Sequence, residues 1–172
     1  DSIVINGSIG DHGMAIMSAR NELKLSAPLL SDCASLNHLI ATVLETCSEV
    51  RFMRDATRGG LATVITELCR NRDFGINIRE EKLQINEGVR GMCELLGFDP
   101  MYVANEGKVV LVVPGSEAEK VVGAMRSHEL GRDSRIIGEV VREHPGKAWL
   151  STAIGGNRII DMLAGEQLPR IC

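Results

Sequence analysis

The 172-residue sequence predicts an α+β domain, a mixed α/β sandwich in which helices pack on a mostly antiparallel or mixed sheet. Short apolar runs bounded by glycine and proline alternate with longer stretches of helical periodicity. The two kinds interleave unevenly, and the end of the chain is rich in predicted strands. The apolar fraction of 44% supports a full core, and because only 3% of residues are aromatic, this core must consist of aliphatic side chains.

Seven short runs that are apolar, or that alternate apolar and polar residues, are expected as strands: 3–5, 50–54, 75–79, 108–113, 134–141, 148–151 and 158–160. The fourth run is almost continuously apolar, and Pro114 ends it because proline has no N–H for a sheet ladder. Pro145 and Gly146, between the fifth and sixth runs, predict a hairpin-like turn there.

Five stretches with apolar residues at helical spacing are expected as helices: 11–23, 36–44, 59–70, 87–96 and 116–127. Ser31 or Asp32 can cap the second helix, since both side chains accept hydrogen bonds from free N–H groups. Ser116 with Glu119 forms a capping box for the fifth helix, and Gly97 ends the fourth.

Charge and composition exclude several classes of protein. A net charge of −4 leaves no electrostatic footprint for nucleic acid, and the few aromatic residues argue against stacking on bases. No run of 18 apolar residues and no signal peptide occur, so we expect no membrane contact and a cytoplasmic location.

The five cysteines stand at positions 33, 47, 69, 93 and 172, without a C-x-x-C pair. This spacing fits neither a disulfide framework nor a zinc site, and we predict no metal site in the chain. Cys47, Cys69 and Cys93 lie in apolar helical stretches and are expected as small core residues.

The chain ends in Leu168-Pro169-Arg170-Ile171-Cys172, an unusual place for a thiol. Pro169 disfavours a terminal helix, and Gly165 provides a hinge upstream. An extended tail from this hinge spans roughly 20–25 Å, so Cys172 could visit another site as a swinging carrier arm. The alternative is an ordinary exposed cysteine.

Three polar, glycine-containing segments interrupt the apolar pattern at junctions of predicted elements: 6–13, 54–60 and 105–108. Glycine lets backbone approach a ligand, and a helix N-terminus attracts anions. Arg58 followed by Gly59 and Gly60 at a helix start therefore suits a phosphate. None of the three is a known nucleotide fingerprint, and each alone is more often turn chemistry.

Four segments resemble the C-terminal half of the hydrogenase maturation factor HypE family: Asn6-Gly-Ser-Ile-Gly-Asp-His-Gly13, Arg54-Asp-Ala-Thr-Arg-Gly-Gly60, Ala104-Asn-Glu-Gly-Lys108 and Pro169-Arg-Ile-Cys172. The resemblance covers the whole chain, and the terminal segment is highly specific. The second and third segments alone indicate only the wider superfamily of aminoimidazole ribonucleotide synthetase and selenophosphate synthetase. The resemblance implies the fold of the C-terminal domain of that synthetase.

The resemblance also implies a reaction and partners. The carbamoyltransferase HypF loads a carboxamide onto the thiol that matches Cys172, and an ATP-dependent dehydration converts this thiocarboxamide to a thiocyanate. The cyano group then passes to iron held by HypC and HypD and becomes a ligand of a [NiFe] hydrogenase. ATP and Mg²⁺ are expected mostly in an N-terminal domain, which also forms the family's homodimer.

The family roles carry over residue by residue. Glu106 is the candidate base or orienting carboxylate, and its alternative role is a turn or ion-pair residue. Arg58 would stabilise charge on a transferred phosphoryl group and Asp55 would orient it; alternatively the two form a pair that braces the loop. His12 could shuttle a proton or be structural, and Lys108 could be a solvated strand flank. The remaining expected nucleotide contacts are Thr57, Gly59, Gly60 and Asn105.

We expect residues 1–162 to form the domain and 163–172 a flexible tail, with the N-terminal ATP-binding domain absent from this chain. The 172-residue chain alone is therefore expected to be inactive and monomeric. Two alternatives remain. One is a non-catalytic module whose terminal cysteine docks with a partner, and the other is a different ATP-dependent synthetase or kinase of the superfamily.

Overall fold

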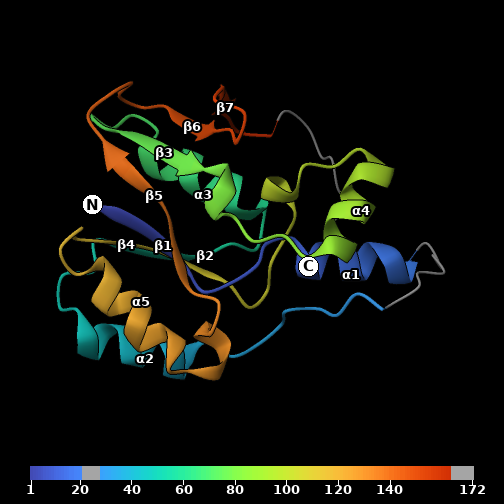
Figure 1. Ribbon diagram of the computed structural model, residues 1–172, viewed down its shortest axis with the longest axis horizontal. Helices are drawn as coiled ribbons and strands as arrows, with labels where there is room; N and C mark the ends of the chain where they lie inside the picture. The colour runs from blue at the N-terminus through green and yellow to red at the C-terminus, as the bar shows by residue number, and fades with distance from the viewer. Residues whose placement is uncertain (21–27, 164–172) are drawn as a thin grey trace.

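Within residues 1–20 and 28–163, which the computed structural model describes, five α-helices pack on a seven-stranded sheet (Figure 1). This arrangement confirms the predicted α+β fold. The strands are β1 (Ser2–Ile5), β2 (Phe52–Asp55), β3 (Gly75–Arg79), β4 (Val109–Val113), β5 (Arg135–Val141), β6 (Ala148–Ser151) and β7 (Asn157–Ile160). The helices are α1 (Asp11–Arg20), α2 (Asn37–Thr46), α3 (Gly60–Cys69), α4 (Glu87–Leu96) and α5 (Ala118–Arg126).

The sheet has the strand order β2-β4-β1-β5-β3-β6-β7. All neighbouring strands are antiparallel except β3 and β6, which are parallel. The mixed sheet therefore fits the prediction, but the hairpin-like turn at Pro145 and Gly146 is wrong, because β3 lies between β5 and β6. A local turn signal does not determine which strands become neighbours in a sheet.

Both faces of the sheet are covered at β1 and β4, which explains why these strands are strongly apolar. In β1, Ile3 and Ile5 pack on one face with α3, whereas Val4 packs on the other face with α2 and α5. The five residues of β4 divide between the two faces in the same way, and all are buried. Figure 1 shows α2 and α5 side by side below the sheet. A strand covered on both faces reads as a continuous apolar run.

Helices α1 and α4 form a third, smaller core at one end of the molecule (Figure 1). Met14 and Met17 of α1 pack against Val89 and Met92 of α4. The predicted first helix continues to residue 23, but residues 21–27 lie outside the described part of the chain. This small core holds the N-terminus of α1 beside the strand ends.

Two predicted helix caps are wrong. Helix α2 begins at Asn37, and neither Ser31 nor Asp32 caps it, because both side chains bind elsewhere. Helix α5 begins at Ala118 without a side-chain cap, so Ser116 and Glu119 form no capping box. Ser and Asp favour caps, but they also bind distant partners when the fold supplies them.

Cys47, Cys69 and Cys93 are buried, as predicted, with at most 3% of their surface exposed. Burial raises the pKa of the Cys69 thiol and raises that of Cys93 to about 11. The thiols of Cys69 and Cys93 therefore stay protonated at neutral pH, and all three buried cysteines act as core residues. Cys33 is exposed.

Among the described residues, no helix is both long enough and apolar enough to span a membrane.

We predict that Leu111→Ala lowers the free energy of unfolding of this chain by about 2–5 kcal/mol, because the side chain is fully buried between the sheet and the layer of α2 and α5. Leu95→Ala is the matched control, since Leu95 is 70% exposed and its truncation should cost at most about 0.5 kcal/mol. Urea denaturation measures both values, and equal losses would contradict the layer arrangement.

Candidate functional site

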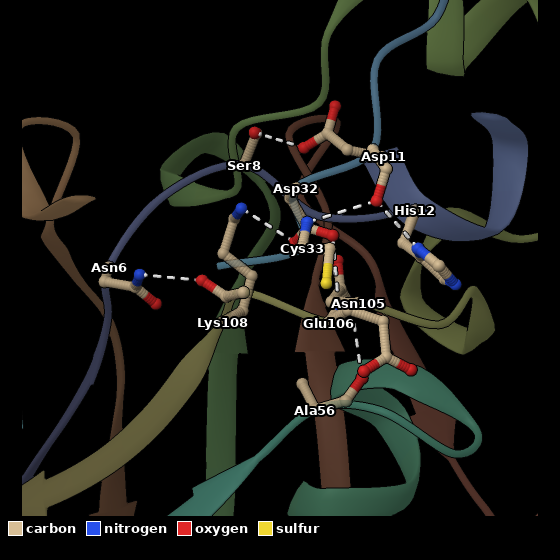
Figure 2. A network of polar contacts seen from close by, with 12 residues as sticks. Asn6, Ser8, Asp11, His12, Asp32, Cys33, Ala56, Asn105, Glu106 and Lys108 are labelled. Carbon is tan, nitrogen blue, oxygen red and sulfur yellow. Dashed lines mark hydrogen bonds and ion pairs between the residues drawn. The ribbon is translucent and has the colours of Figure 1, made fainter. Parts of the chain in front are cut away.

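The three polar segments meet at one end of the sheet because of how their strands pair. β1 and β2 both run antiparallel to β4, with Ile5 opposite Val110 and Asp55 opposite Val109. The carboxyl ends of β1 and β2 therefore lie beside the amino end of β4. Segments 6–13, 54–60 and 105–108, which are far apart in sequence, become neighbours (Figure 2).

Asn105 links these three segments with its side chain and is completely buried. Its Oδ1 accepts a hydrogen bond from the Gly10 N–H at 2.7 Å, and its Nδ2 donates to the carbonyls of Ala56 and Val103 at 3.2 and 3.0 Å. Its backbone N–H donates to the Ala56 carbonyl as well. Asn105 thus satisfies buried backbone groups, and it belongs to the frame of the site.

Asn6 holds the same strand start from the other side. Its Nδ2 donates to the carbonyls of Gly107 and Leu130, both at 3.0 Å, and its Oδ1 accepts from the Val109 N–H at 2.8 Å. Only 3% of Asn6 is exposed. Two buried asparagines therefore fix the backbone on both sides of Glu106.

Glycines allow the segments to approach one another closely. Gly60 has a φ of 60°, and a Cβ there would overlap the backbone carbonyls of Val103 and Met101. A Cβ on Gly107 would overlap the carbonyl oxygen of Asp32. Gly60 and Gly107 therefore serve close packing of backbone against backbone, whereas the sequence pattern predicted an approach of backbone to a ligand.

Lys108 and Asp32 form an ion pair of 2.8 Å, with 10% and 6% of their side chains exposed. The expectation of a solvated flank at Lys108 is therefore wrong, since the buried carboxylate of Asp32 draws the ammonium inward (Figure 2). The second oxygen of Asp32 accepts from the Glu106 N–H at 3.0 Å. Sequence reasoning missed this role, because the only signal at Asp32 was its preference for helix caps.

His12 lies in the first turn of α1, and its Nδ1 is 2.8 Å from the Oγ of Ser31. The preceding residue, Asp11, is bound by Ser8 and Asn86 at the start of the helix. Ser31 and Cys33 were not predicted as site residues, yet the segment that contains them lies beside His12. The sequence around Ser31 and Cys33 contains no motif that would predict a contact with His12.

The loop after β2 keeps its own internal contacts. The Thr57 N–H donates to Oδ1 of Asp55 at 3.3 Å, and the hydrogen bond from the Thr57 side chain is the main cause that lowers the Asp55 pKa. Within the described residues, Asp55 and Arg58 form no ion pair, so the bracing alternative is not what the structure shows. Arg58 is exposed and has no ion-pair partner in this part of the chain.

Glu106 is half-buried, and within the described residues its carboxylate forms no hydrogen bond or ion pair. A hollow of about 280 Å³ opens at Gly107 and Lys108, and Glu106 does not line it. The hollow is lined by parts of four segments: 6–8, 31–34, 107–108 and 129–133. Cys33 and Lys108 both belong to this lining.

The predicted site residues are only partly brought together. His12, Glu106 and Asn105 lie in one network of polar contacts, and Figure 2 shows the Glu106 side chain directed away from Asn6 and Lys108. Asp55 ends β2, whereas Thr57, Arg58 and Gly59 lie on the adjoining loop and Gly60 begins α3. Cys172 lies outside the described residues. Within those residues, no group of three or more His, Cys, Asp or Glu side chains could hold a metal ion.

The chain belongs to a recognised family of domains. Residues 1–150 match the family described as AIR synthase related protein, C-terminal domain. Within this class the chain is similar to carbamoyl dehydratase HypE, which confirms the resemblance seen in the motifs. It is 46% identical to HypE of Rhodobacter capsulatus over 172 residues, which is 100% of this chain and 51% of that protein.

Solved structures of HypE agree with this placement. A crystal structure of HypE in complex with ATP covers 99% of this chain with a TM-score of 0.92 and 38% identity. One of a HypE–HypF complex covers 94% of this chain with a TM-score of 0.88 and 45% identity. In each case the chain spans about half of the HypE polypeptide, 52% of the solved chain.

We predict that Asn105→Ala lowers the free energy of unfolding by about 3 kcal/mol, because the buried Gly10 N–H and Val103 C=O lose their side-chain partner, while the Ala56 carbonyl keeps only the backbone N–H of residue 105. The neighbouring Glu106→Ala is the control, and it should change stability by no more than about 0.5 kcal/mol. Denaturant unfolding of both variants measures the two losses of free energy. Similar losses would contradict a supporting role of Asn105.

A second prediction concerns Asp55. Thr57→Val removes the hydroxyl that lowers the Asp55 pKa, so the pKa should rise towards its ordinary value. Thr57→Ser keeps a hydroxyl and should leave the pKa low. Because the folded-state pKa is lowered, the hydrogen bond contributes to stability above the ordinary pKa, and this contribution is lost as the pH falls. NMR titration of the Asp55 carboxyl carbon measures the pKa; an unchanged value in Thr57→Val would contradict this cause.

Proposed function

We propose that this chain is the C-terminal, tail-bearing domain of an ATP-dependent carbamoyl dehydratase that serves [NiFe] hydrogenase maturation. The observation that carries the proposal is the 46% identity to a HypE that extends over the complete chain. The gathering of segments 6–13, 54–60 and 105–108 at one edge of the sheet supports it, because these are the segments that carry the motif resemblance.

The proposed reaction converts a thiocarboxamide on Cys172 to a thiocyanate, with the net loss of one water. The nitrogen loses both protons and the carbon loses its oxygen, while the C–S bond stays intact. An amide oxygen is a poor leaving group, and ATP supplies the phosphoryl group that improves it. Glu106 is the proposed base, since its carboxylate is half-buried and has no partner within the described residues.

His12 and Arg58 supply two further proposed roles. The half-buried His12 is held by Ser31 and is placed to shuttle a proton. Arg58 fits a phosphate contact, since its exposed guanidinium has no ion pair in the described residues and lies next to Gly59 and Gly60 at the start of α3. Asp55 and Thr57 orient this loop, and Asn105 supports it from below.

The partners and the role of an N-terminal domain follow from the same proposal. HypF loads Cys172, and the HypC–HypD complex receives the cyano group. An N-terminal domain holds most of the ATP contacts and Mg²⁺ and forms the homodimer, so the isolated chain is expected to be monomeric and inactive. We further propose that the protein acts in the cytoplasm.

The test uses a full-length protein of the length of the HypE relatives, incubated with HypF, its carbamoyl donor and ATP. Cys172→Ala should abolish carbamoyl loading, whereas Cys33→Ala, which changes an exposed cysteine of the domain, should leave it intact. Mass spectrometry of the C-terminal peptide follows a carbamoyl adduct and then the loss of one water. Loading of Cys172→Ala at the wild-type level would overturn the carrier role.

In the same assay, Glu106→Gln should load normally but dehydrate at least about 100-fold more slowly, because the amide cannot act as a base. Dehydration at the wild-type rate would remove Glu106 from the reaction and leave the carrier role standing.

A further inference from the structure

Asp32 binds the backbone of the candidate base, Glu106, although Asp32 itself lies outside the segment 105–108. Its Oδ1 accepts from the Glu106 N–H at 3.0 Å, and its Oδ2 accepts from the Lys108 Nζ at 2.8 Å. The Asp32 side chain is 6% exposed, so both oxygens are used in a dry environment. One carboxylate thus binds the residue before and the residue after Gly107.

The position of Glu106 depends on its backbone. Within the described residues its carboxylate has no hydrogen bond or ion pair of its own. The neighbouring backbone groups are held by Asn6 and Ala56, which lie at the strand ends. Among residues 1–20 and 28–163, only Asp32 holds the N–H of Glu106 itself, and Asp32 belongs to a segment without helix or strand.

The segment 32–34 lies directly on Gly107. Any side chain at position 107 would overlap the Asp32 carbonyl and approach the Ala34 N–H. Position 107 therefore requires glycine because the segment 32–34 packs against its backbone. Backbone contact and carboxylate contact together fix the segment against the candidate base.

The same segment reaches the candidate proton shuttle at its other end. Ser31 Oγ lies 2.8 Å from Nδ1 of His12 and accepts from the Cys33 N–H at 3.1 Å. His12 belongs to α1, whereas Glu106 precedes β4, so the segment 31–33 connects two separate elements. Figure 2 shows Asp32 and Cys33 between His12 and Lys108.

We propose that Asp32 is a positioning residue that sets the placement of Glu106. The inference rests on the proposed function, because it assigns Asp32 a role towards the proposed base. Asp32 does not touch the reacting atoms. Its carboxylate acts through the Glu106 N–H, and Lys108 supplies the counter-charge that lets this carboxylate be buried.

The physics of buried ion pairs supports a geometric role. Such pairs stabilise a fold weakly, because desolvation offsets the Coulomb attraction, but removing one partner alone is costly. A single substitution would therefore mix positioning with the cost of an unpaired charge. Replacing both partners by neutral residues separates the two effects.

The test compares two double variants of the full-length protein: Asp32→Asn with Lys108→Met, and Asp32→Ala with Lys108→Met. Both remove the buried charges, but only Asn keeps an oxygen that accepts from the Glu106 N–H. The first should stay within about 5-fold of the wild-type rate of dehydration of preloaded Cys172. The second should lose about 30- to 100-fold, the scale of a 1 Å misplacement.

Two further readouts exclude a merely structural effect. Amide exchange of the Glu106 N–H should become faster only in the Ala variant, at matched melting temperature. In a Glu106→Gln background, the Asp32→Ala and Lys108→Met changes should cost less than about 3-fold, because Asp32 acts through Glu106.

Equal losses of rate in both double variants, or an undiminished effect in the Glu106→Gln background, would overturn the positioning role. Failure of the proposed function is distinguishable from this. It would appear as normal loading of Cys172→Ala, whichever residue occupies position 32, whereas an unimpaired rate in Glu106→Gln alone would remove the proposed base and leave the carrier role standing.

Discussion

The hydrogen bonds of the Asn105 side chain are the interaction on which this end of the molecule depends. Three segments that leave or enter the sheet must turn where no strand partner satisfies their backbone. The buried Asn105 amide has two donor hydrogens and an acceptor oxygen. It binds backbone groups of Gly10, Ala56 and Val103 that have no strand partner at these positions. Because an unpaired buried N–H or C=O is costly, this amide stabilises the meeting of the segments beyond the backbone hydrogen bonds that also join them.

The strand order of the sheet provides the place for that interaction. The pairing of β4 with β1 on one side and β2 on the other brings residues separated by more than half of the chain to one edge. The layers of α2, α5 and α3 bury both faces, so the strands cannot shift in register without exposing apolar side chains. The rigid sheet and the polar edge are thus two consequences of one packing arrangement.

The polar edge separates supporting side chains from available ones. Asn6, Asn105 and Lys108 are buried and bound within the chain, whereas Glu106 and Arg58 have no ion-pair partner among the described residues. This division is expected of a site, because a reactive group needs a fixed backbone and a free side chain. Each family motif therefore contains supporting residues together with residues whose side chains are available, and the motif alone does not show which is which.

The sequence by itself determined the fold class, the elements and the core thiols, since these follow from local periodicity and apolar content. It also determined the family, through motifs that cover the whole chain. The caps at Ser31, Asp32 and Ser116, the hairpin at Pro145 and the solvated Lys108 were wrong. Only the tertiary structure decided these, because a polar side chain chooses between a local backbone group and a distant partner that the sequence does not reveal. For Asp32, the buried Lys108 and the Glu106 N–H, more than 70 residues away, made that choice.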